Sequence, residues 1–188
     1  MPAPSQDDAR VQYNRGYYGS SERYLVKALR EVARRIEGLI IDLEGPQLRW
    51  RASDESWCAT ELIGFLRDSE REDLLAVRAM LRRDGAPIEE RRAYHGPDEH
   101  NYRDAMIEEL WWDFADLREN MVWTLRAGSD DSGWDNAGEH VFRGRIPLVD
   151  YVRQINERDL DTMWKLYDLR EQMEAASIAR QSVPRGAA

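Results

Sequence analysis

The stretch INERDLDTMWKL, residues 155–166, places polar side chains where an amphipathic helix would bury apolar ones. Asp159 and Thr162 share one helical face with apolar residues, because side chains three and four positions apart lie side by side on a helix. Arg158 lies directly beside them. A carboxylate, a hydroxyl and a guanidinium on a buried face could bind a polar ligand, or they could pair with one another inside the core.

The three histidines are further candidates for metal binding. His95 and His100 lie with Glu99 in the segment AYHGPDEHNY, and His140 lies in a later connection. Two metal-binding histidines on one helical face need a spacing of four, whereas these two are five residues apart across a Gly-Pro pair. We therefore expect His95 and His100 to be surface residues, with a site built from His95, Glu99 and His100 as the less favoured alternative.

Cys58 is the only cysteine, so an intrachain disulfide is excluded. It has no neighbouring histidine in the sequence to activate its thiol. Glu61 follows three residues later, which is the spacing of a capping box, where two side chains bind the free backbone N–H groups at the start of a helix. We expect Cys58 to cap a helix rather than to act as a nucleophile.

Composition limits the class of protein. A chain of 188 residues is long enough for one domain with one core. Its formal net charge of -9 opposes binding to nucleic-acid phosphate and to anionic lipid. No run of about 18 apolar residues occurs, and the first residues lack the apolar centre of a signal peptide. We expect a cytoplasmic protein that binds neither nucleic acid nor membrane.

Four segments must position these residues. Each carries the three- and four-residue apolar spacing of an amphipathic helix, and they cover about 20–43, 59–83, 102–126 and 147–176. Strand signals are nearly absent, and we expect a long polar loop over 128–144. Residues 1–19 and 177–188 are expected to be mobile.

Four amphipathic helices bury their apolar faces most economically as an all-α, up-down four-helix bundle. The connections, of about 14 to 18 residues, are longer than bundles usually have. We therefore expect one or more of them to cross an end of the bundle or to cover a pocket.

Two segments resemble the DinB-like superfamily, four-helix-bundle metalloenzymes related to bacillithiol transferases. ESWCATELIGFLRDSE, 55–70, is similar to the start of the family's second helix, with matches at Trp57, Cys58, Glu61, Leu66, Asp68 and Glu70. EHVFRGRIPLVDYVRQI, 139–155, is similar to the entry to its fourth helix, with matches at His140, Gly144 and Leu148 and, further on, at Asp159. The resemblance follows the helix order of nearly the whole chain and implies the same bundle.

The resemblance also implies that the metal site of the family is lost. Members with this site bind a divalent metal through three histidines, at positions that hold Phe65, Arg158 and Thr162 here. A phenyl ring has no lone pair to donate, a guanidinium is permanently cationic, and a threonine hydroxyl is a poor ligand for zinc or nickel. We expect no metal and no cofactor, and a non-catalytic bundle that binds a small molecule or a protein partner. The alternative is a metal-dependent thiol transferase or hydrolase with a non-standard site.

The resemblance implies that Arg158 and Thr162 face the centre of the bundle. A buried guanidinium needs acceptors, and the candidates are Glu61, Asp68, Asp159 and Asp161. We expect an internal network that fills the position of the metal. The alternative is a pocket in which Arg158 receives an anionic group of a small molecule, lined by Phe65, Asp68, His140, Arg158, Asp159 and Thr162. For His140 we favour a hydrogen bond, donated by its ring, that fixes its loop.

The sequence LWWDF places three rings at different directions around one helix, so they cannot all enter one core. Core packing is the first interpretation for Trp111, Trp112 and Phe114, and a homodimer contact through a Trp111/Trp112 face is the second. The densest basic patch, RAMLRRDGAPIEERRAY, 78–94, could touch an acidic partner, but acidic residues dilute it and we expect a solvated face.

Overall fold

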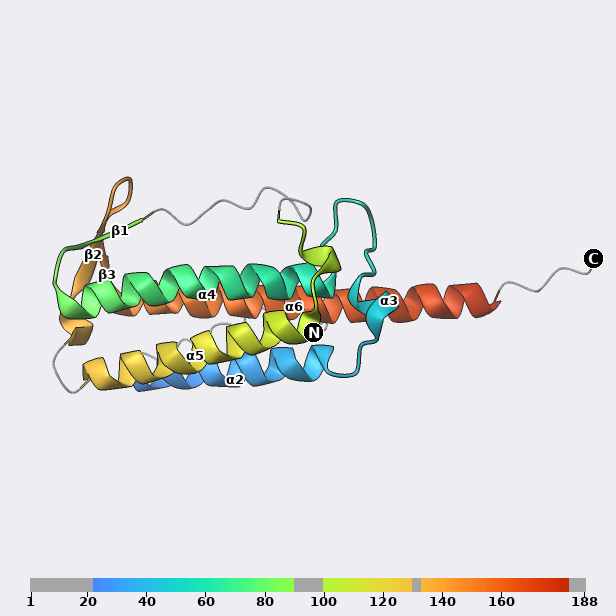
Figure 1. Cartoon of the computed structure of the whole chain (residues 1–188), viewed down its shortest axis with the longest axis horizontal. Coiled ribbons are helices and arrows are strands. Elements are labelled where there is room, and N and C mark those ends of the chain that lie inside the picture. Colours follow the sequence, from blue (N-terminus) through green and yellow to red (C-terminus); the bar gives the residue numbers. More distant parts are fainter. Residues whose placement is uncertain (1–21, 90–99, 130–132, 183–188) are drawn as a thin grey trace, which may run out of the picture.

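The computed structural model describes residues 22–89, 100–129 and 133–182. Its long helices are α2 (Glu22–Ile40), α4 (Ala59–Arg82), α5 (Ile107–Ser129) and α6 (Leu148–Ser182), which pack side by side along the long axis of the molecule (Figure 1). Three short helices, α3 (Gly45–Leu48), η1 (Tyr102–Asp104) and η2 (Gly133–Asp135), lie in the connections. The all-α four-helix bundle predicted from periodicity is confirmed. None of the described helices is long and apolar enough to cross a membrane.

The helix directions depart from strict up-down alternation. α4 and α5 are parallel, because Arg67 binds Asp113 near their first turns while Gly128 lies against Leu81 near their last turns. α2 and α6 are also parallel to each other and run in the opposite direction (Figure 1). The connection from α4 to α5 therefore begins at one end of the bundle and reaches α5 at the other. This span accounts for a connection longer than an antiparallel helix pair requires.

A small sheet at one end of the bundle corrects the prediction of a long polar loop over 128–144. Its strands are β1 (Ala86–Ile88), β2 (Ala137–His140) and β3 (Gly144–Pro147), in the order β1-β2-β3, with β1 parallel and β3 antiparallel to β2 (Figure 1). Strands of three and four residues are too short to show a clear alternating pattern, and the sequence AGEH in β2 has no β-branched residue. Sequence periodicity could not detect them.

The last helix continues past its predicted end near residue 176, through Ser182. The segment EQMEAASIAR holds good helix formers and neither Gly nor Pro, so nothing in it stops the helix. Arg170 binds the Leu39 carbonyl and the Asp42 carboxylate at the end of α2. Beyond this point α6 extends past the other helices (Figure 1).

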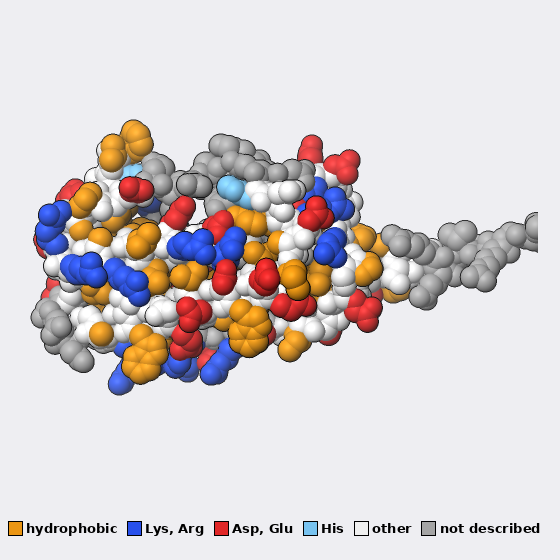
Figure 2. All heavy atoms as spheres, viewed as in Figure 1, with side chains coloured by type: hydrophobic (Ala, Val, Ile, Leu, Met, Phe, Trp, Pro, Cys, Tyr) orange, Lys and Arg blue, Asp and Glu red, His pale blue; other side chains and the backbone are white. Residues whose placement is uncertain are grey.

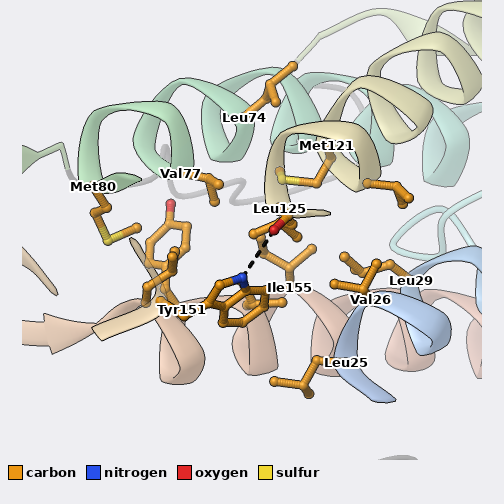
Figure 3. Close-up of a cluster of buried hydrophobic side chains, with 14 of the residues drawn as sticks. Leu25, Val26, Leu29, Leu74, Val77, Met80, Met121, Leu125, Tyr151 and Ile155 are labelled. Carbon is orange, nitrogen blue, oxygen red and sulfur yellow. Dashed lines mark hydrogen bonds between the residues drawn. The ribbon is translucent and has the colours of Figure 1, made fainter. Parts of the chain in front are cut away.

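The core consists of two apolar clusters that follow each other along the bundle. The cluster at the sheet end includes Leu25, Leu29, Val77, Met121, Leu125 and Ile155, and the indole of Trp134 donates a 3.1 Å hydrogen bond to the Leu125 carbonyl there (Figure 3). The cluster at the other end includes Ile36, Leu62, Leu66, Phe114, Leu160 and Leu166. In α4, α5 and α6, five residues between the two clusters are charged: Glu70, Asp73, Arg118, Arg158 and Asp159.

At Gly64, η1 packs closely against the backbone of α4. A Cβ atom at this position would lie 2.4 Å from Cγ of the Tyr102 ring. The ring cannot move without loss of the hydrogen bond from its hydroxyl to Asp68. We predict that Gly64→Ala lowers the free energy of unfolding by about 1 to 3 kcal/mol, the usual cost of an overpacked site. Urea unfolding followed by circular dichroism measures this loss.

Gly38 is the matched control, because it is an exposed helical glycine with nothing within 4 Å of an added Cβ atom. Gly38→Ala should raise the free energy of unfolding by about 0.5 to 1 kcal/mol, since alanine loses less backbone entropy in a helix. Equal effects of the two substitutions would contradict the close packing of Tyr102 on Gly64.

Candidate functional site

The five charged residues between the two apolar clusters form one buried group, which we name the polar layer: Glu70 and Asp73 from α4, Arg118 from α5, and Arg158 and Asp159 from α6. The three carboxylate side chains are 0% exposed, Arg118 is 3% exposed and Arg158 is 10% exposed. Charges at such depth must be paired, because water no longer solvates them.

Arg118 connects all four long helices. Its Nε and Nη2 atoms donate to the two carboxylate oxygens of Glu70, each at 2.8 Å, and its Nη1 atom donates to the Leu29 carbonyl in α2 at 2.9 Å. Nη2 also lies 2.6 Å from Oδ2 of Asp159, an ion pair that lacks hydrogen-bond alignment. The guanidinium lies over the Phe114 ring, 4.9 Å from its centroid.

Arg158 donates hydrogen bonds to three carboxylates. Nη2 donates to Glu70 at 3.2 Å and to Asp159 at 2.9 Å, Nε donates to Asp159 at 3.3 Å, and Nη1 donates to Asp73. The Tyr151 hydroxyl donates to the other oxygen of Asp73 at 2.8 Å. The guanidinium is therefore held by groups of α4 and α6 on several sides.

The polar layer keeps both arginines charged. Burial alone lowers the pKa of the Arg118 guanidinium, but the charges of Asp159 and Glu70 outweigh burial, so that its pKa is raised. The same balance raises the pKa of Arg158, where Asp73, Asp159 and Glu70 outweigh burial. An arginine that stays protonated cannot serve as a general base or acid near neutral pH.

The polar layer does not fit a divalent metal. A divalent metal requires neutral imidazole or free carboxylate ligands, whereas the three carboxylates here converge on two guanidiniums. Across residues 22–89, 100–129 and 133–182, no group of three or more His, Cys, Asp and Glu side chains is placed to hold a metal ion. The centre of the bundle is closed by ion pairs.

The internal network predicted around Arg158 is present, and Asp159 is one of its acceptors. The prediction is wrong for the other three candidate acceptors, which bind other residues. Asp68 accepts from Tyr102 and pairs with Arg67, Asp161 pairs with Lys165 on the surface, and Glu61 pairs with Arg51. Thr162 is buried, but its hydroxyl donates to the Arg158 carbonyl of its own helix at 3.0 Å.

Sequence reasoning missed three members of the polar layer, namely Glu70, Asp73 and Arg118. Their spacing in the sequence could have indicated that they are buried. Leu66, Glu70, Asp73 and Val77 follow each other at steps of four, three and four, as do Phe114, Arg118, Met121 and Leu125. A charged residue at such a position lies on the apolar face of its helix. The α4 pattern has two charged interruptions and the α5 pattern has one, and only the packing of three helices brings these charges together.

The structure does not bring the six residues of the predicted pocket together. Phe65 is half-buried and lies edge-on to Trp57, with ring centroids 5.8 Å apart. His140 lies in β2 at the sheet end, where its Nδ1 atom accepts hydrogen bonds from the backbone N–H groups of Phe142 and Arg143, both at 3.2 Å. It fixes the β2–β3 turn as predicted, but these bonds are accepted rather than donated.

The remaining candidates lie outside the polar layer. His95 and Glu99 lie outside the described residues, whereas His100 stacks on Tyr102 with ring centroids 5.4 Å apart. Of the three rings in LWWDF, Phe114 is fully buried and Trp111 is half-buried, with its indole N–H donating to Glu37 at 3.3 Å. Trp112 is 71% exposed, so core packing does not account for it. A homodimer through this face stays a prediction.

Cys58 caps α4, as predicted. Its backbone N–H donates to the Glu61 carboxylate at 2.8 Å, and its side chain accepts from the backbone of Glu61. The thiol is fully buried, and burial is the main cause that raises its pKa to about 11. A nucleophilic cysteine requires the opposite, an exposed thiol with a lowered pKa.

No protein-family model and no curated protein matches this sequence. Among solved structures, the chain is similar to one described as "YfiT from Bacillus subtilis is a probable metal-dependent hydrolase with an unusual four-helix bundle topology", with a TM-score of 0.69 and 13% identity. The match covers 93% of this chain and 92% of YfiT. At this identity the likeness shows the fold alone, and it supports the four-helix bundle expected from the sequence.

Arg118→Met tests the polar layer as a unit. The substitution keeps the length of the side chain but leaves Glu70 and Asp159 with only Arg158 as a cation, so we predict a loss of about 3 to 5 kcal/mol in the free energy of unfolding. The double variant Arg118→Met/Glu70→Leu, which removes one cation and one anion, should lose less. Chemical denaturation of the four proteins in this double-mutant cycle gives the coupling energy.

Arg71→Met is the control for that cycle. Arg71 is also on α4 but is 52% exposed, with a long ion pair of 3.6 Å to Asp68, so its loss should cost no more than about 1 kcal/mol. If Arg71→Met and Arg118→Met had equal effects, the polar layer would not be a stabilising unit.

Cys58 should resist alkylation in the folded protein. Its pKa is raised from 9.0 to about 11, so the thiolate fraction at pH 8 falls about a hundredfold relative to the unfolded chain. The folded state favours the protonated thiol, so this contribution to stability is complete below pH 9 and is lost as the pH rises through 11. Iodoacetamide labelling with mass spectrometry, in buffer and in urea, measures the first effect.

Cys58→Ser separates the pH effect from the capping role. The serine hydroxyl can cap α4 but does not titrate in this range, so the fall in stability between pH 9 and 11, on the order of 2 kcal/mol, should be smaller in the variant. Rapid labelling of the folded protein at pH 8 would show that the thiol is not held as described.

Proposed function

We propose that this protein is a non-catalytic DinB-like bundle that acts by binding a partner. The observation that carries the proposal is the polar layer, because it occupies the interior of the bundle with paired charges. The three residues at the positions of the family's metal-binding histidines also support a non-catalytic role. Phe65 packs on Trp57, Arg158 is held by carboxylates, and Thr162 binds its own helix. Of the three side chains, only the Thr162 hydroxyl has lone pairs to donate, and a single hydroxyl is a poor ligand for zinc or nickel.

The chemistry of the remaining groups supports a binding role. The buried thiol of Cys58 has a raised pKa, both arginines of the polar layer stay charged, and His140 holds a turn at the end of the bundle. A catalytic site needs a nucleophile or a titrating group beside an accessible cavity. Among the described residues, each of these groups has a structural role instead.

The second candidate is a metal-dependent hydrolase. The description of YfiT as a probable metal-dependent hydrolase favours it, since the two chains share a fold over nearly their whole length. Such an enzyme would need ligands other than Phe65, Arg158 and Thr162. The carboxylates of the polar layer are poor substitutes, because a metal would have to displace Arg158.

Metal content distinguishes the two candidates. We predict that purified, tag-free protein contains well under one zinc, nickel or manganese ion per chain, and that none of these metals raises its melting temperature. A ligand specific for the folded state, at a hundred times its dissociation constant, adds about 2.7 kcal/mol, which a thermal melt detects readily. Elemental analysis by mass spectrometry and melts with each metal give both measurements.

Protein stripped with a chelator serves as the reference for these melts. Near one metal per chain, together with a rise in melting temperature on adding that metal back, would overturn the proposed binding role. The hydrolase would then become the working hypothesis, and the metal ligands would have to be found by substitution of individual carboxylates and histidines.

A further inference from the structure

A row of cations follows the outer face of α2. Arg23, Lys27, Arg30 and Arg34 follow each other at steps of four, three and four, which is the spacing of one helical face. We name this row the α2 basic stripe. With Arg126 from the last turns of α5, it lines an open groove of about 920 Å³ between α2 and α5.

The groove is locally basic on an acidic protein. It is lined by five cations, Arg126 and the four of the α2 basic stripe, and by two anions, Glu22 and Glu31, which gives a formal local charge of +3 on a chain of -9. Its ion pairs are exposed. Arg30 lies 3.1 Å from Glu119, at 33% and 52% exposure, and Arg34 lies 3.7 Å from Glu31. Exposed pairs contribute little to stability, so these cations can exchange their acceptors for those of a ligand.

An exposed aromatic side chain lies on the same face of α5 as Arg126, which lines the groove. Trp123 is 64% exposed and follows Glu119, the acceptor of Arg30, by four residues and precedes Arg126 by three, which is the spacing of one helical face. Figure 2 shows exposed aromatic side chains over α5 and basic side chains along the edge formed by α2. Exposed tryptophan beside arginine is typical of residues that dominate the affinity of protein interfaces.

The size of the α2 basic stripe indicates the size of its ligand. Arg23 and Arg34 are eleven residues apart on one helix, which is roughly 16 Å at 1.5 Å per residue. A small anion would meet one or two of these cations. A helix with carboxylates at the same four-three-four spacing would meet all of them along its length, in the manner of helix-in-groove recognition. Nucleic acid fits less well, because Glu22, Glu31 and Glu119 repel a continuous row of phosphates.

We propose that the groove between α2 and α5 binds an acidic helical segment of a partner protein, with the α2 basic stripe on its carboxylates and Trp123 against its apolar side. This inference rests on the proposed function for the existence of a partner. Its test is separate, since peptide binding does not depend on metal content.

The chain offers an internal reporter, because Lys27 and Lys165 are its only lysines. Lys27 lies in the groove, whereas Lys165 is exposed on α6, paired with Asp161 at 2.7 Å. The probe is a synthetic alanine-based helical peptide of about 18 residues with glutamates at the four-three-four spacing, and a matched peptide carries glutamines instead. Acetylation of the full chain, read by mass spectrometry, should fall at Lys27 and stay unchanged at Lys165 when the acidic peptide is added.

Two charge-matched variants complete the experiment. Arg23→Gln/Lys27→Gln removes two cations from the groove, and Arg78→Gln/Arg82→Gln removes two from α4. Fluorescence anisotropy with the labelled acidic peptide should show affinity reduced about tenfold or more in the first variant and less than about twofold in the second. The glutamine peptide should bind weakly to all three proteins.

Several results would overturn the proposal. Equal losses in the two variants would mean unspecific attraction, and tighter binding of a single-stranded oligonucleotide of similar length would make nucleic acid the occupant. In the free chain, acetylation of Lys165 but not of Lys27 would mean that another part of the chain, for example residues 1–21, covers the groove. Sedimentation analysis could also show that the protein forms dimers. If the Arg23→Gln/Lys27→Gln variant no longer forms them, the occupant of the groove would be a second copy of the chain.

Discussion

The rest of the structure depends on the pairing of charges between the two apolar clusters. Arg118 is satisfied only if Glu70 of α4, Asp159 of α6 and the Leu29 carbonyl of α2 all lie around it at once. A slide of one helix by a single turn, about 5.4 Å, would leave at least one of these charges buried without a partner. Apolar packing alone tolerates such slides far better. The polar layer therefore fixes the register of four helices whose apolar faces are otherwise similar.

The same constraint divides the molecule by role. Inside, three carboxylates converge on two guanidiniums, and among the described residues no group of side chains is placed to hold a metal. At one end, the small sheet and the turn held by His140 close the bundle. Along the outside of α2 and α5, cations lie in exposed, weakly held pairs beside Trp123. The proposed binding role would therefore use the surface of the bundle, although a solved structure with a similar fold is described as a probable metal-dependent hydrolase.

Periodicity predicted the four helices because each buries a continuous apolar face, and it identified Asp159 and Thr162 because these two polar groups interrupt one such face. The family resemblance, not periodicity, predicted that Arg158 is turned inward. Periodicity could not predict that α4 and α5 are parallel, since an amphipathic pattern carries no direction; only the length of the connection hinted at it. Glu70, Asp73 and Arg118 were missed because a charged residue on the apolar face of one helix does not show which charges of another helix it meets. The sheet was missed because three- and four-residue strands show too little alternation, and β2 begins with Ala-Gly.

The polar layer also restricts how such a sequence can change over generations. Loss of one buried partner costs about 3 to 5 kcal/mol, a large share of the 5 to 15 kcal/mol that holds a typical domain together. Replacing the whole group with apolar residues is often neutral, but that route requires several substitutions at once. Single mutational steps away from the layer therefore pass through poorly folded intermediates. Surface residues can change in single steps at little cost in stability, whereas the buried ion pairs persist because each step away from them lowers the free energy of unfolding.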